Sequence, residues 1–178
     1  MVHTPNKLNP LSAAEHATAA DALSQIAAAT SAALGVVLDL ERRVSAMMPR
    51  GEYSPERLPQ PYRDFCCTAA FDSQIPNGGF PQAICNSTGD YLPFLADAYR
   101  RFGADSQAYA IDKLNTLIPE TAKATDDDRT EWMSDMSCDE ASRFYEYSDT
   151  FTADGYDHAR LCRLRYAVDN PSDFFLSE

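Results

Sequence analysis

The chain has 178 residues, of which 27 are Asp or Glu and 15 are Lys or Arg, so its formal net charge at pH 7 is −12. A charge of this sign repels the phosphate backbone, which argues against direct nucleic-acid binding and favours a cationic partner. The longest uncharged run, Ala22 to Leu38, is too short and too polar for a membrane span, and no signal peptide is apparent, so we expect a cytoplasmic protein without membrane contact.

An Ala-rich N-terminal helix, covering residues 1–38, is the first element that the pattern predicts. Apolar residues recur at steps of three and four from Leu23 to Met47, and Ser12 to Glu15 form a plausible capping box. Four prolines from Pro49 to Pro61 indicate a connecting loop. A second helix is predicted from Tyr62 to Gln74, because Pro76 disfavours helix in the residue before it.

The segment from Gln74 to Asp90, QIPNGGFPQAICNSTGD, contains three of the seven glycines. Asn77, Gly78 and Gly79 tolerate the positive φ that a sharp reversal between helices requires, and Phe80 follows as an apolar plug. A glycine pair could also hold a phosphate, but neither GxGxxG nor GxxxxGK[ST] is present. The spacing therefore predicts a joint between helices.

A short helix and a longer one are predicted after this joint. Pro81 suits the first turn of a helix that runs to Cys85, and Gly89 is expected to end it in the left-handed conformation. Asp90 is expected to cap the next helix, which runs from Tyr91 to Phe102.

The remaining pattern is helical as well. No segment alternates with period two, so the sequence predicts an all-α fold, a single-domain compact bundle of roughly seven to eight helices over residues 1–178. The helices still to come are predicted over residues 105–117, 126–136, 137–151 and 157–168. Ser137 to Glu140 resemble a second capping box, which starts the third of these helices, and its apolar positions are Phe144, Tyr147 and Phe151.

The negative charge is concentrated in the second half, where residues 105–178 carry seventeen acids and seven bases. Asp128, Glu131 and Asp135 share one face of a predicted helix. Asp139, Glu146 and Asp149 share one face of the next predicted helix. Like charges at this spacing cost about 0.2 to 0.5 kcal/mol per close pair, so a role other than folding is indicated. The predicted partner-binding residues are all acidic: Asp126, Asp127, Asp128, Glu131, Asp135, Asp139, Glu140, Glu146 and Asp149.

Helix geometry suggests what such a face could do. Carboxylates one turn apart are separated by about 5.4 Å along the axis, which is comparable to the charge spacing of a phosphate backbone. A rigid acidic face could therefore replace DNA against a basic surface. The alternative is that the charge only keeps the protein dispersed in solution.

Other chemistry is not supported by the sequence. The five cysteines and three histidines form no metal-binding pattern, and the Asp126 to Asp128 run lacks the order of a calcium loop, so we predict no metal and no cofactor. Cys66 and Cys67 have apolar neighbours, which favours inert buried thiols. Asp157 and His158 are adjacent and would point to different sides of a helix, so no catalytic residue is predicted.

The run from Phe71 to Pro119 resembles a bacterial helical family of otherwise unassigned function whose best-studied members are DNA mimic proteins. The resemblance covers residues 40–168 and departs from the pattern at Pro76, Pro81 and Cys85. It implies an all-helical fold, often dimeric, and for studied members an acidic surface that occupies the DNA-binding face of a helix-turn-helix regulator. The motif residues that carry it are Asn77, Gly78, Gly79 and Phe80, then Asn86, Ser87, Thr88, Gly89 and Asp90.

Together these observations predict a non-enzymatic, acidic protein that occupies the DNA-binding surface of a basic protein such as a helix-turn-helix transcription regulator. A homodimer is implied by the resemblance. One alternative is an immunity or antitoxin-like protein that neutralises a basic toxin or nuclease, using exposed aromatics such as Tyr145. Another is an enzyme of unknown reaction.

Overall fold

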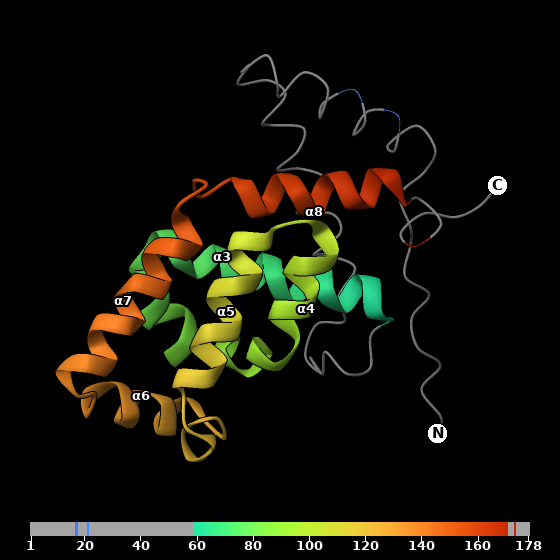
Figure 1. Cartoon of the computed structure of the whole chain (residues 1–178). Helices are drawn as coiled ribbons and strands as arrows, with labels where there is room; N and C mark the ends of the chain where they lie inside the picture. Colours follow the sequence, from blue (N-terminus) through green and yellow to red (C-terminus); the bar gives the residue numbers. More distant parts are fainter. Residues whose placement is uncertain (1–16, 18–20, 22–58, 171–172, 174–178) are drawn as a thin grey trace, which may run out of the picture. The chain divides into compact units, whose positions relative to one another are not determined.

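The computed structural model describes residues 17, 21, 59–170 and 173. Within these residues the chain is helical and contains no strand, so the predicted all-α class is confirmed (Figure 1). The predicted Ala-rich N-terminal helix lies outside the described residues. The elements in chain order are α3 (Gln60–Cys85), η2 (Ser87–Tyr91), α4 (Leu92–Phe102), α5 (Asp105–Leu117), η3 (Glu120–Ala122), α6 (Asp126–Ser134), α7 (Cys138–Thr152) and α8 (His158–Asp169).

The described ranges hold six α-helices and two short 3₁₀ helices, so the predicted number of seven to eight helices is slightly too high. The two helices predicted on either side of the glycine joint form one kinked element, α3, and the predicted N-terminal helix lies outside the described residues. None of the helices in these ranges combines the length and the apolar character that a membrane crossing needs.

The chain forms two compact units. One spans residues 67–163, and the other comprises the residues before 67 and after 163. Each boundary falls inside a helix, one in α3 and one in α8. The contacts described below lie within residues 67–163.

An aromatic cluster forms the centre of this unit. The Phe151 ring lies 5.0 Å from Phe80, 5.9 Å from Phe71 and 5.5 Å from Tyr99, in each case edge to face. Phe144 adds a further edge contact, with its ring 6.0 Å from Phe80. Such pairs contribute about 0.5 to 1.5 kcal/mol each beyond the burial of apolar area. The cluster therefore fixes α7, which supplies two of the rings, against α3 and α4.

A buried polar cluster lies beside these rings. The Tyr99 hydroxyl donates to Asp72 Oδ1 at 2.6 Å, and Arg163 donates to Asp72 Oδ2 at 2.7 Å. Arg163 also donates to the Thr68 hydroxyl at 3.3 Å, and its side chain is fully buried. Burial, and then the Asp72 carboxylate, raise the pKa of Tyr99 well above its ordinary value. The buried arginine is thus paired and hydrogen-bonded, as a charge in the interior must be.

The joint between helices lies at the predicted glycines, but the helix before it runs further than predicted. We predicted that the helix ends before Pro76, and this is wrong, because α3 continues through Pro76 and breaks at Gly78 and Gly79, where φ of Gly79 is +66°. Pro76 has no amide hydrogen to donate to the Asp72 carbonyl, so α3 lacks one helical hydrogen bond in the turn before the break. The Asn77 side chain donates to the Ser73 carbonyl at 3.0 Å and so satisfies one of the terminal acceptors.

Replacing Gly79 with valine is expected to lower the free energy of unfolding by about 2 kcal/mol, since φ of +66° with ψ of −161° is a conformation that only glycine adopts readily. Urea titration followed by circular dichroism measures the loss. Ser73→Val, at an exposed helical position nearby, is the control and should cost only a few tenths of a kcal/mol. Equal unfolding midpoints for the two variants would show that the joint does not require glycine.

Candidate partner-binding site

Helix α6 begins with three aspartates whose positions serve the helix itself. Thr125 is the N-cap: its hydroxyl oxygen accepts from the Asp128 amide at 3.1 Å, and its hydroxyl donates to Asp128 Oδ2 at 2.7 Å. Asp126 and Asp127 occupy the same first turn, where the positive end of the helix dipole favours carboxylates. Folding alone therefore accounts for these three acids.

Helix α7 begins with a capping box, as the sequence predicts for Ser137 and Glu140. The Ser137 amide donates to Glu140 Oε2 at 2.9 Å, and the Glu140 amide donates to the Ser137 hydroxyl at 3.3 Å. Hydrogen bonds from the side chain and then the backbone of Ser137 lower the pKa of Glu140 below its ordinary value. Glu140 and Asp139, both in the first turn of α7, thus also have a structural role.

Four acids remain that no helix start explains: Glu131, Asp135, Glu146 and Asp149. All four are exposed. Asp135 is the C-cap residue of α6, because the helix predicted to reach Met136 ends at Ser134, and negative charge at a helix C-terminus is unfavourable. These four side chains are the strongest candidates for a role in binding.

On α7 the acids and the core residues occupy opposite sides. Phe144 and Phe151 are buried, whereas Asp139, Glu146 and Asp149 are exposed. Glu146 and Asp149 line a shallow, open depression together with the side chain of Tyr145, which is 62% exposed. Helix α7 therefore presents Asp139, Glu146 and Asp149 on its outward side, with the exposed Arg143 between Asp139 and Glu146, and the aromatic cluster holds this side in place.

The acids of α6 differ in how far their side chains are exposed. Asp127 and Glu131, one turn apart, are both exposed, while Asp128 is half-buried against Thr125. On the inward side, Arg129 is fully buried and Trp132 packs edge to face on Phe144 at 6.4 Å. The exposed pair of α6 is thus Asp127 with Glu131.

None of the nine predicted acids forms an ion pair in the described part of the chain, where Lys123 pairs with Glu120, and Arg160 pairs with Asp157. Arg143, the base on α7, donates to the backbone carbonyl of Asp139 at 3.3 Å. The negative field of α6 and α7 is therefore available to an external cation.

Arg129 is a key residue that the sequence reasoning missed. Its Nε donates to the Ile84 carbonyl at 2.7 Å, and a terminal nitrogen donates to Asp90 Oδ1 at 2.8 Å and to the Asn86 carbonyl at 3.4 Å. The side chain thereby ties α6 to the end of α3 and to η2. Its position as the one base in the acidic segment predicted over 126–136 is the signal that could have identified it.

This arginine explains the motif residues that the sequence analysis misread. Gly89 lies in η2 without positive φ, so its predicted left-handed cap is wrong; a Cβ atom there would meet the Ile84 carbonyl oxygen at 2.1 Å and Arg129 Nε at 2.5 Å. Asp90 pairs with Arg129 and does not cap α4, whose N-cap is Tyr91 with no side-chain hydrogen bond. The segment from Asn86 to Asp90 therefore binds the Arg129 side chain.

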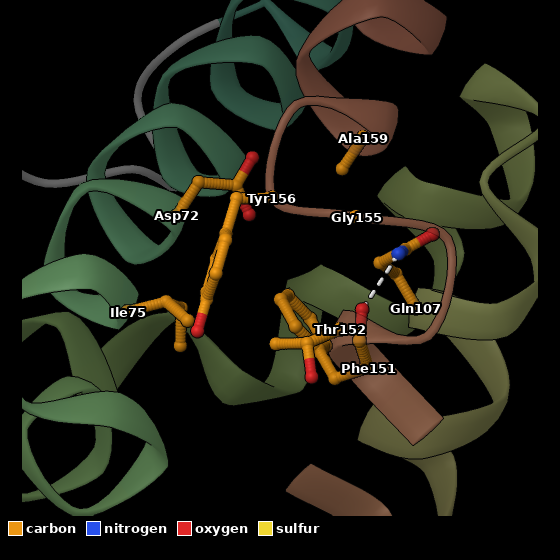
Figure 2. Close-up of a pocket in the computed structure, with 8 residues that line it drawn as sticks. All are labelled: Asp72, Ile75, Gln107, Phe151, Thr152, Gly155, Tyr156 and Ala159. Carbon is orange, nitrogen blue, oxygen red and sulfur yellow. Dashed lines mark hydrogen bonds between the residues drawn. The ribbon is translucent and has the colours of Figure 1, made fainter. Parts of the chain in front are cut away.

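An enclosed cavity in the same unit is too small for a substrate. Figure 2 shows it between α3, α5, α7 and the start of α8, with Gln107 bonded to the Phe151 carbonyl at 2.7 Å. Its volume of about 10 Å³ has room for about one water molecule, whereas small-molecule sites occupy about 300 to 1,000 Å³. The exposed acidic side chains of α6 and α7 are therefore the better candidate site.

Comparison with known families gives one match, to a family described as DMP19-like protein, over residues 56–170. No curated protein and no solved structure matches the chain. The matched residues include the glycine joint, the segment from Asn86 to Asp90 that binds Arg129, and both acidic helices.

Proposed function

Because the chain belongs to the DMP19-like family, which is a family of DNA mimic proteins, we propose that it is a non-enzymatic DNA mimic that occupies the DNA-binding surface of a basic protein, such as a helix-turn-helix regulator. The observation that carries this proposal is the set of exposed acids with no folding role, Glu131, Asp135, Glu146 and Asp149. We propose a cytoplasmic protein, and a homodimer is compatible with this role.

The physical basis is charge complementarity on a rigid support. Lysine and arginine side chains that normally contact phosphates would form charge-assisted hydrogen bonds with these carboxylates. Glu146 and Asp149 lie one helical turn apart, about 5 Å along the axis, so neighbouring cations of a DNA-binding surface can each reach one acid. Because the acids are exposed, the attraction should weaken as salt is added.

A second candidate is neutralisation of a basic toxin or nuclease, and the exposure of Tyr145 favours it. An aromatic side chain beside carboxylates is typical of the anchors in tight protein interfaces. Both functions use the same face. The captured partner distinguishes them, because a regulator presents a recognition helix and a nuclease presents an active-site cleft.

Removing three of the candidate acids is expected to weaken partner binding about tenfold at low salt, since each exposed ion pair contributes about 0.5 kcal/mol. The test variant carries Glu131→Gln, Glu146→Gln and Asp149→Asn. The basic protein is first captured from native lysate on the wild-type chain, released with duplex DNA and identified. Calorimetry on the purified pair then measures Kd for each variant.

The matched control removes the same number of charges elsewhere, through Asp97→Asn, Asp112→Asn and Glu120→Gln. These acids are exposed and pair with Arg100 and Lys123. We expect the control to bind nearly as tightly as the wild type. A folded test variant with unchanged Kd would rule out mimicry through α6 and α7, and a partner that duplex DNA does not displace would rule out a DNA-binding surface as the target.

A further inference from the structure

Three chemically active side chains follow one another at the start of α8. His158 and Cys162 lie one turn apart on α8, and Asp154 lies in the turn that precedes this helix. Cys162 Sγ is 3.5 Å from His158 Nε2, and the same nitrogen is 4.0 Å from Asp154 Oδ2. Cys162 Sγ also lies 3.8 Å from the Gly103 carbonyl oxygen at the end of α4.

This geometry places a base beside a thiol. The distance between Sγ and Nε2 permits a hydrogen bond between the thiol and the ring, in which the imidazole nitrogen can accept the thiol proton. The thiolate is the nucleophilic form of cysteine. The other charged groups on this segment, Asp157 and Arg160, pair with each other, and α4 presents a backbone carbonyl.

The other described cysteines have different surroundings. Cys66 and Cys67 are buried, and Cys85 contacts the Met133 sulfur at 3.8 Å. Cys138 is exposed, at the start of α7. Cys162 contacts the imidazole of His158 and is half-buried, so a small reagent can reach it.

We propose that Cys162 is a reactive thiol, activated by His158, that is modified by small electrophiles of the hydroperoxide class. The Sγ proton passes to His158 Nε2, and the thiolate attacks one peroxide oxygen as the O–O bond breaks. The sulfur becomes a sulfenic acid, and the departing oxygen takes the proton from Nε2 and leaves as water or alcohol. The sulfur is oxidised by two electrons and the peroxide is reduced by two. This inference is independent of the proposed DNA mimicry.

The test compares two cysteines within one molecule. The full chain is alkylated with iodoacetamide at neutral pH, and mass spectrometry of peptides gives the labelling rates of Cys162 and Cys138. We expect His158→Gln to lower the ratio of the Cys162 rate to the Cys138 rate at least about tenfold, because the Cys162 thiol loses its base. Asp157→Asn, which removes a neighbouring carboxylate without touching His158, should leave the ratio unchanged. An unchanged ratio in His158→Gln would overturn the proposal.

A second measurement uses the wild-type chain alone, so it does not depend on the folding of a variant. The protein is treated with hydrogen peroxide in the presence of dimedone, which forms a stable adduct with sulfenic acids. We expect the adduct at Cys162. Absence of an adduct at Cys162, at peroxide concentrations that modify Cys138, would also overturn the proposal.

Discussion

Replacing Arg129 with alanine is expected to lower the free energy of unfolding by about 4 kcal/mol. The Arg129 side chain is fully buried, so its removal leaves a cavity between α6, η2 and the end of α3. It also leaves the buried carbonyl of Ile84 without this donor, at a cost of about 1 to 3 kcal/mol. Asp90 contributes little to the loss, because its side chain is 58% exposed and stays hydrated when the arginine is absent.

Urea unfolding followed at 222 nm measures this change, with Arg143→Ala as the matched control. Arg143 is exposed on α7 and its guanidinium bonds to a backbone carbonyl within the same helix, so its loss should change stability by less than about 0.5 kcal/mol. Arg129→Lys keeps the charge but lacks the planar donor fork, so it should fall between the two. If Arg129→Ala and Arg143→Ala unfold at the same urea concentration, Arg129 does not hold α6 in place.

This contact also bears on the acidic face. Glu131 is two residues from Arg129 on α6, and the geometry of its carboxylate depends on how firmly the helix is anchored. A folded Arg129 variant carries the same acids as the wild-type chain, but it should bind the proposed partner less tightly. Preorganised charges bind better because less order has to be created on association.

Local rules in the sequence predicted the features that are locally determined. Apolar residues at steps of three and four gave the all-α class, and the capping box of Ser137 and Glu140 is present because both partners lie within one helical turn. Phe144 and Phe151 were assigned to the inward side of α7 for the same reason, and both are buried. These features need only the spacing of residues along one helix.

Features that depend on distant residues were not predictable in this way. The sequence gives no sign that the carbonyl of Ile84 meets Arg129, 45 positions away, or that Asp72 meets Arg163, 91 positions away. Gly89 was assigned a turn conformation because turns are the usual reason for glycine. Its actual role, to leave room for a side chain from another helix, appears only when the chain is folded.

The candidate site was partly predictable. Periodicity placed Asp139, Glu146 and Asp149 together on α7, and all three are exposed. On α6 it grouped Asp128 with Glu131 and Asp135, and of these three Asp128, which is bonded to the N-cap Thr125, is the least exposed. Acids in the first turn stabilise a helix, as they do in α6 and α7, so the number of acids in a segment overstates the number available for binding.

Replacing Gly89 with alanine is expected to lower the free energy of unfolding by about 3 kcal/mol. This loss is larger than the one expected for the same change at Gly103, although of these two glycines it is Gly103 that has a positive φ, of +79°. The added methyl at Gly89 would overlap the Ile84 carbonyl oxygen and Arg129 Nε, so the chain must shift and strain the hydrogen bond between them. At Gly103 no atom lies within 4 Å of the new methyl, and the cost is the left-handed backbone alone, about 1 kcal/mol.

A double-mutant cycle separates the two causes at Gly89. If overlap with Arg129 contributes, Gly89→Ala should cost at least about 1 kcal/mol less in an Arg129→Ala background than in the wild type, because residues in contact are not additive. Part of the cost should persist there, since the Ile84 carbonyl oxygen remains 2.1 Å from the added atom. Equal costs in the two backgrounds would mean that Gly89 makes room for the backbone of α3 and not for the arginine, and the segment from Asn86 to Asp90 would then be a turn whose glycine is independent of α6.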